Sequence, residues 1–163
     1  MPELTAERAR ELFEYEPLTG VLTRRTRKGT GKAGAVVGCK NSEGYMVTSV
    51  DGRLYYNHRL VWLIVYGRWP MNEIDHTNGD KVDNRLTNLR DATSTSNKEN
   101  LRGARSNNRS GFLGVCWVAK NKKFQASIQV GGKAIHIGLY TTAEEAYQAY
   151  LETKRQLHAG NTL

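Results

Sequence analysis

The sequence lacks long apolar runs and has few cysteines, and each of these shortages excludes a class of protein. No apolar stretch approaches the roughly 20 residues of a membrane-spanning helix, and the N-terminal residues lack the apolar core of a signal peptide. Cys39 and Cys116 stand without the paired spacing of a zinc site. We therefore expect a cytoplasmic protein that is not secreted, with no membrane partner, no zinc and reduced thiols.

Acidic residues are also in the minority. Against 24 Lys and Arg the chain has 16 Asp and Glu, which gives a formal net charge of +8. Clustered basic side chains gain free energy when phosphates release their counterions, so nucleic acid is the expected partner. A basic, glycine-rich stretch follows Gly20, and it is either a solvated loop or an arm that contacts phosphates. Its candidate DNA contacts are Arg24, Arg25, Arg27 and Lys28.

The first part of the chain predicts a helix and a small sheet. Residues 5–13 have helical spacing with Thr5 as a possible cap. Residues 45–50 and 53–57 are β-rich and flank Asp51 and Gly52, a strong signal for a two-residue hairpin turn. Residues 58–66 predict a buried helix ended by Gly67. We expect an N-terminal helix and sheet region over residues 1–56 that contacts DNA.

The centre of the chain predicts strand, loop, strand and helix. Strands are expected at residues 74–76 and 89–93, and a helix at 95–101 capped by Ser94. Asp75 and Asn97 offer oxygen donors that suit a hard divalent ion. His76 can take a proton from water near neutral pH. Together these residues supply what hydrolysis of a phosphodiester needs, provided that the first strand ends at His76, because neighbouring strand residues point to opposite sides.

The segment HRLVWLIVYGRWPMNEIDHTNGDKVDNRLTNLRDATSTSNKEN resembles the HNH family of phage and intron-encoded homing endonucleases. The resemblance implies a ββα-metal (His-Me finger) nuclease core over residues 57–104. It also implies His76 as general base, Asp75 and Asn97 on one divalent ion, and Asn88 as the residue that steadies the loop, with Asn84 nearby as a rival for that place. The expected ion is Mg²⁺, with Mn²⁺ as the alternative, and the expected products carry a 5′ phosphate and a 3′ hydroxyl. We expect a structural role for His58, and for Arg59 either phosphate contact or a solvated position.

The end of the chain predicts a separate module. Residues 105–111 have the composition of a linker and include Arg105 and Arg109. Strands are expected at 112–118, 123–130 and 133–140, and Thr142 with Glu145 predicts a capping box for the helix that follows. Over 112–160 we expect a three-stranded antiparallel sheet packed on one helix. Polar residues alternate with apolar ones along 123–130, so one face of the sheet is polar.

The stretch from Gly111 to Tyr150 resembles the Apetala-type DNA-binding domain of plant ethylene-response factors. The resemblance rests on Gly114, Val115, Phe124, Ala126, Ile128, Ile137, Gly138, Tyr140, Thr142, Glu145, Ala146 and Tyr150. In that family the sheet reads DNA mainly through arginines and tryptophans. Here Cys116, Gln129, Ala134 and His136 occupy such places, so the target sequence does not transfer, and Trp117 belongs either to the core or to the DNA face. The predicted DNA contacts are Arg59, Arg105, Arg109, Lys120, Lys122, Lys123, Gln125, Ser127, Gln129, Lys133 and His136.

These observations predict an α+β protein that binds double-stranded DNA as a monomer, without an organic cofactor, and cuts it. The alternative is a sequence-specific DNA-binding regulator that keeps an inactive nuclease scaffold. RNA binding is a weaker alternative, because the sheet lacks the exposed aromatic platform on which single-stranded bases stack.

Overall fold

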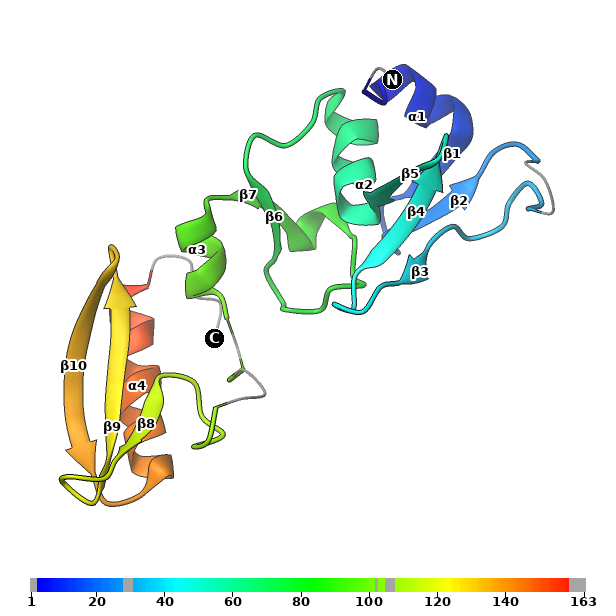
Figure 1. Cartoon of the computed structure of the whole chain (residues 1–163). Coiled ribbons are helices and arrows are strands. Elements are labelled where there is room, and N and C mark those ends of the chain that lie inside the picture. Colours follow the sequence, from blue (N-terminus) through cyan, green and yellow to red (C-terminus); the bar gives the residue numbers. More distant parts are fainter. Residues whose placement is uncertain (1–2, 28–30, 102, 105–107, 159–163) are drawn as a thin grey trace. The chain divides into compact units, whose positions relative to one another are not determined.

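A computed structural model describes residues 3–27, 31–101, 103–104 and 108–158 of the chain. They form two compact units, Met1–Thr93 and Ser94–Leu163. Every sheet is antiparallel and helices pack against the sheets, which confirms the α+β class (Figure 1). The division falls at Thr93, ahead of the linker predicted at 105–111, so the helix that follows Thr93 belongs to the second unit.

The described residues of the first unit form two α-helices, a single 3-10 turn and seven short strands. In chain order they are α1 (Ala6–Leu12), β1 (Phe13–Glu16), β2 (Val21–Arg24), β3 (Cys39–Lys40), β4 (Met46–Val50), β5 (Arg53–Tyr56), α2 (Asn57–Tyr66), β6 (Glu73–His76), η1 (Leu86–Asn88) and β7 (Leu89–Ala92). The β1–β2 hairpin and β3 are absent from the sequence prediction, because these strands have only four, four and two residues and each carries little local signal.

Local signals explain why the predicted elements of this unit form. Thr5 caps α1 and its hydroxyl accepts a hydrogen bond from the Arg8 amide. Asp51 and Gly52 have φ values of 48° and 80°, the left-handed pair that a tight hairpin turn requires. Helix α2 ends at Gly67 in the left-handed conformation. Its residues Leu60 and Val61 are fully buried and form the centre of the core.

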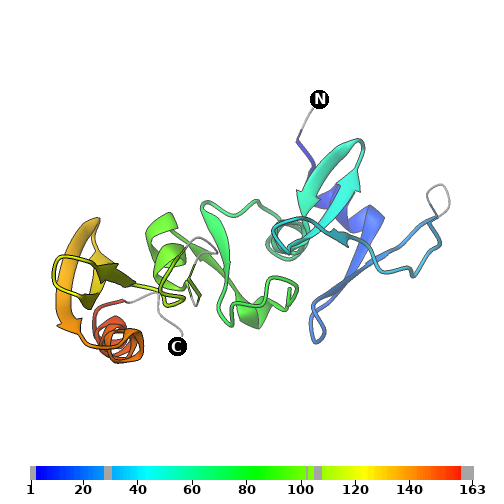
Figure 2. The same ribbon diagram turned by 60° about the horizontal axis from the view of Figure 1, so that its bottom comes forward.

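The second unit contains α3 (Ser94–Glu99), β8 (Val115–Val118), β9 (Lys123–Val130), β10 (Lys133–Tyr140) and α4 (Ala143–Leu157). The three strands form an antiparallel sheet in the order β10–β9–β8, and α4 lies along one face of it (Figures 1 and 2). Ala126, Ile128 and Ala146 pack between sheet and helix. The capping box of Thr142 and Glu145 is present. This confirms the predicted sheet-and-helix architecture of the C-terminal region.

Two predicted elements are shorter than expected. Helix α3 begins at Ser94 itself and ends at Glu99, and β8 begins at Val115 because the preceding residues are held in turns by Asn108 and Ser110. The segment just after α3 is bound to α4 through Lys154, a buried lysine whose Nζ donates to the carbonyl of Leu101. No helix in the described ranges combines the length and the apolar character that a membrane span requires.

Candidate active site

Strands β6 and β7 place an acid and a histidine side by side at the end of a short ladder. Asp75 pairs with Arg90 across the ladder and His76 pairs with Leu89. Strand β6 ends at His76, which is the condition that the sequence set for both side chains to serve one site. Both are buried, with exposed fractions of 6% and 4%. Arg90 donates from Nε and Nη2 to Oδ2 of Asp75 at 2.9 and 2.7 Å. The positive charge of the Arg90 guanidinium therefore balances the negative charge of the buried carboxylate.

His76 is held by an asparagine of the following loop. Its Nε2 lies 3.2 Å from Oδ1 of Asn84, and this acceptor favours the tautomer with the proton on Nε2 and the lone pair on Nδ1. Burial lowers the pKa of His76 below its ordinary value, although the hydrogen bond to Asn84 and the carboxylate of Asp75 oppose that shift. The ring is therefore neutral at physiological pH, the state in which it can accept a proton.

Asn88 contacts the loop rather than the histidine. Its Oδ1 accepts from the Thr77 hydroxyl at 3.0 Å and from the Asn78 amide at 2.9 Å. Its Nδ2 donates to the Asp83 carbonyl at 2.8 Å. Asn88 thus joins the two ends of the loop between β6 and η1. The structure divides the two candidate roles, with Asn84 at His76 and Asn88 in the loop.

Replacing Asn88 with alanine is expected to lower the free energy of unfolding by roughly 2–4 kcal/mol, since three hydrogen bonds of a buried side chain are lost at about 1 kcal/mol each and their part-buried partners lose an anchor. Urea denaturation measures the change. Thr87→Ala is the matched control, because Thr87 is the exposed neighbour of Asn88. A loss equal to that of the control would contradict the anchoring role.

The N-terminal hairpin supports this loop from behind. The Tyr15 hydroxyl donates to the Asn84 carbonyl at 3.0 Å and accepts from the Leu86 amide at 3.1 Å. Gly20, at φ 75°, leaves no room for a side chain, because a Cβ there would lie 2.5 Å from the Arg85 nitrogen. Lys81 ties the far side of the loop to the Glu43 carbonyl at 2.9 Å. Residues of the predicted region 1–56 therefore help to shape the surroundings of His76, which the sequence did not indicate.

His58 lies against His76, and this neighbour was also not predicted. The two ring centroids are 5.2 Å apart with an interplanar angle of 86°. Tyr45 contacts both imidazoles, at 5.4 Å from His58 and 5.9 Å from His76, and Tyr56 stacks on His58 at 5.3 Å. Burial lowers the pKa of His58 to about 3, and the nearby His76 and Arg59 add to that shift. His58 is consequently neutral at any physiological pH.

The oxygen ligand that the first unit offers at this site, the Asp75 carboxylate, suits a hard cation that keeps part of its water shell. Among the residues that the structure describes, no group of three or more His, Cys, Asp or Glu side chains forms a metal cage. Asp75 is a single carboxylate that a cation would share with Arg90. Mg²⁺ is commonly held by one or two carboxylates, with water and substrate phosphate completing its shell, so Asp75 suits that ion. Asn97 lies in α3 of the second unit, and its part in the metal site stays a prediction from the sequence.

The basic residues predicted to contact DNA differ in their surroundings. Arg59 donates to the Asn72 carbonyl at 3.3 Å and lies 5.7 Å from the Trp69 ring, so part of its binding capacity is used within the fold. Arg25 donates from Nε to the Phe13 carbonyl at 3.0 Å. Arg24 is half-buried in β2, whereas Arg27 and Arg109 are exposed. Lys28 and Arg105 lie outside the described residues.

The polar row predicted on β9 lies on the face of the sheet opposite α4. Gln125, Ser127 and Gln129 alternate with residues of the core, and His136 joins the row because it pairs with Ser127. Lys123 begins the same row, and Lys120 and Lys122 are exposed in the turn before it. Figure 2 shows this face of the sheet turned away from α4. We call Lys123, Gln125, Ser127, Gln129 and His136 the open-face row.

Two other residues of the sheet lie on the helix-facing side. Lys133 pairs with Val130, which packs against the core, so Lys133 is exposed at the start of β10 but is not part of the open-face row. Trp117 pairs with Phe124, and their rings meet edge to face at 4.9 Å. Trp117 therefore lies on the helix-facing side of the sheet, where it is half exposed and outside the buried core.

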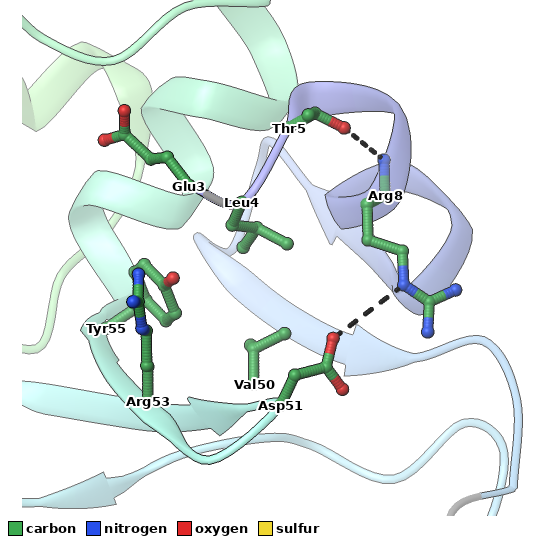
Figure 3. Close-up of a pocket in the computed structure, with 8 residues that line it drawn as sticks. All are labelled: Glu3, Leu4, Thr5, Arg8, Val50, Asp51, Arg53 and Tyr55. Atoms are coloured by element: carbon green, nitrogen blue, oxygen red, sulfur yellow. Dashed lines mark hydrogen bonds and ion pairs between the residues drawn. The ribbon is translucent and has the colours of Figure 1, made fainter. Parts of the chain in front are cut away.

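A pocket of about 300 Å³ lies between the start of α1 and the β4–β5 hairpin (Figure 3). Leu4, Val50 and Tyr55 supply apolar walls, and Arg8 forms an ion pair with Asp51 at 4.0 Å. Neither Asp75 nor His76 lines it. The candidate active site at Asp75 and His76 is therefore separate from this pocket.

The central segment is similar to a known family. Residues 55–102 match the family model described as HNH endonuclease. No curated protein matches the chain significantly. A solved structure titled "DNA binding and cleavage by the HNH homing endonuclease I-HmuI" aligns over 91% of this chain and 88% of that one, with 19% identity and a TM-score of 0.39. The segment that matches the HNH endonuclease model includes Asp75, His76, Asn84, Asn88 and Asn97.

Proposed function

We propose that the chain is a metal-dependent DNA endonuclease of the HNH homing type, which hydrolyses a phosphodiester to leave a 5′ phosphate and a 3′ hydroxyl. The observation that carries the proposal is the buried, neutral His76, which is held by Asn84 and lies beside Asp75 within the segment that matches HNH endonucleases. A histidine in this state can serve as a general base at physiological pH.

In the proposed reaction, His76 takes a proton from a water molecule. The water oxygen attacks the phosphorus, the bond from phosphorus to the 3′ oxygen breaks, and that oxygen leaves as a hydroxyl after protonation. Asp75 and Asn97 would hold one Mg²⁺ or Mn²⁺ ion, which supplies stabilisation of the negative charge on the leaving oxygen. The Asn84 hydrogen bond favours the His76 tautomer with the proton on Nε2, and the loop anchored by Asn88 keeps Asn84 in place.

The proposal assigns DNA recognition to the C-terminal module, in line with its resemblance to Apetala-type domains. Its open-face row offers amide, hydroxyl and imidazole groups on a sheet face, which is a surface that can enter a major groove. Lys120, Lys122 and Lys123 are exposed and suit phosphates, which position a protein without reading sequence. We propose a cytoplasmic monomer, without an organic cofactor, that nicks one strand of double-stranded DNA.

Mapping cleavage ends tests the proposed function. Fragmented genomic DNA of the host is incubated with the whole chain and Mg²⁺, and new ends that carry a 5′ phosphate are captured and sequenced. We expect a discrete set of ends that disappears when EDTA removes the metal. Absence of new ends with both Mg²⁺ and Mn²⁺ would contradict the endonuclease. Selective DNA binding without cutting would instead favour the regulator with an inactive nuclease scaffold.

DNA affinity is expected to fall steeply with salt. About four phosphate contacts would reduce it by on the order of 10² between about 50 and 200 mM salt. Lys122→Ala should weaken binding to all sequences alike and reduce the slope of log affinity against log salt by about 1. Gln125→Ala should instead reduce the preference for the cognate site. Fluorescence anisotropy with cognate and scrambled duplexes measures both effects, and a flat salt dependence would contradict binding through phosphates.

Point variants are preferable here to truncation of the C-terminal module. Lys154 of α4 is bound to the Leu101 carbonyl just after α3, so deletion of α4 would also disturb the helix that carries Asn97. A loss of cleavage in such a truncation would not separate recognition from chemistry.

A further inference from the structure

His58 presents a polar group in a place where an apolar one would be more stable. The residue is 94% buried, with an exposed fraction of 6%. Within the part of the chain that the structure describes, its Nδ1 atom is buried and has no hydrogen-bond partner. A buried polar atom without a partner destabilises the fold, because it has lost its hydrogen bonds to water without replacement. A hydrocarbon ring of similar shape would avoid this cost, so the nitrogen has no stabilising role of its own.

The ring of His58 packs directly against His76, the proposed general base. Its ring meets that of His76 edge to face, Tyr45 contacts both imidazoles, and Tyr56 stacks on His58. Edge-to-face contact is directional, because ring edges are positive and ring faces are negative. An imidazole has in addition a strong in-plane dipole that phenyl lacks. The His58 ring can therefore orient its neighbour in a way that a hydrocarbon ring cannot.

We propose that His58 is a positioning residue of the nuclease site, whose imidazole sets the plane and the tautomer of the His76 ring. Asn84 fixes His76 at Nε2 through a hydrogen bond, and His58 constrains the ring from a second direction. The inference rests on the proposed function, since it gives His76 the role of base. It changes the structural role that the sequence suggested for His58.

The test separates the nitrogen of His58 from its ring. His58→Phe keeps an aromatic ring, and His58→Gln keeps hydrogen-bonding atoms without the ring. For His58→Phe we expect a thermal midpoint equal to or above that of the native chain, DNA affinity within about twofold, and a cleavage rate on bound DNA lower by on the order of 10-fold or more. His58→Gln should recover part of the rate. A merely structural His58 would instead lower the thermal midpoint, and the loss of activity would follow the unfolded fraction.

A second readout does not depend on cleavage. Nitrogen-15 NMR of the imidazoles reports the tautomer of His76 in the native chain and in His58→Phe. A changed tautomer ratio in the variant supports the proposal, and an unchanged one overturns it, whether or not the native chain cuts DNA. A native chain that fails to cut while the tautomer ratio changes would reject the nuclease and keep the coupling of the two histidines. If His58→Phe does not fold, His58→Leu carries the same test.

Discussion

Replacing His76 with alanine is expected to lower the rate of DNA cleavage by on the order of 10² to 10⁴ fold, the usual contribution of a general base. His76 is the proposed base because its buried imidazole is held at Nε2 by Asn84 and lies next to Asp75. Single-turnover cleavage of a labelled cognate duplex measures the rate. DNA affinity, measured without metal, should change by less than about threefold.

Two comparisons make this result specific. Met71→Ala is the matched control, since Met71 precedes β6 and is 82% exposed, and it should cut at the native rate. Added imidazole should restore part of the rate in His76→Ala, because a small base can occupy the space that the side chain leaves. Cleavage by His76→Ala at the native rate would reject His76 as the base.

The second large effect concerns acid stability. In the unfolded chain an imidazole has a pKa near 6.5, whereas burial lowers the pKa of folded His58 to about 3. Below pH 6.5 the unfolded chain therefore binds a proton that the folded chain excludes. The contribution of His58 to the free energy of unfolding decreases by more than about 1 kcal/mol per pH unit as the pH falls, until folded His58 itself is protonated near pH 3. The lowered pKa of His76 acts in the same direction.

The pH range of the measurement matters, because carboxylates also contribute in stronger acid. The Asp83 pKa is lowered to about 2, chiefly by its hydrogen bonds from Arg85, so its stabilising effect is lost between its ordinary pKa and that value. Between about pH 6.5 and 4.5, above most carboxylate pKa values, His58 alone should account for roughly 2–3 kcal/mol.

Urea denaturation at several pH values over this range checks the prediction. His58→Phe is the comparison, because it removes the titrating group while it keeps a ring in the core. The native curve should fall with decreasing pH more steeply than that of the variant. Parallel curves would show that protonation of His58 is not coupled to unfolding.

The segments that the sequence predicted well are those whose signals are local. Thr5 and Thr142 mark helix starts because a hydroxyl caps amides only a few residues away. Asp51 and Gly52 mark a hairpin because the turn depends on their own φ angles. The alternation along β9 separated the core side of the sheet from the open-face row. The acid and histidine of the candidate site were visible because they are adjacent in the chain.

What surrounds His76 was decided by contacts between distant parts of the chain. Tyr15 supports Asn84 across a separation of 69 residues, and His58 meets His76 from the start of another helix. The short β1–β2 hairpin carries little local signal, yet its tyrosine and glycine shape the loop behind the site. The order of residues thus determined which groups are available for chemistry and which turns and caps form. The tertiary structure alone determined which asparagine holds the histidine and which second imidazole packs against it, because side chains find such partners only when the core brings them together.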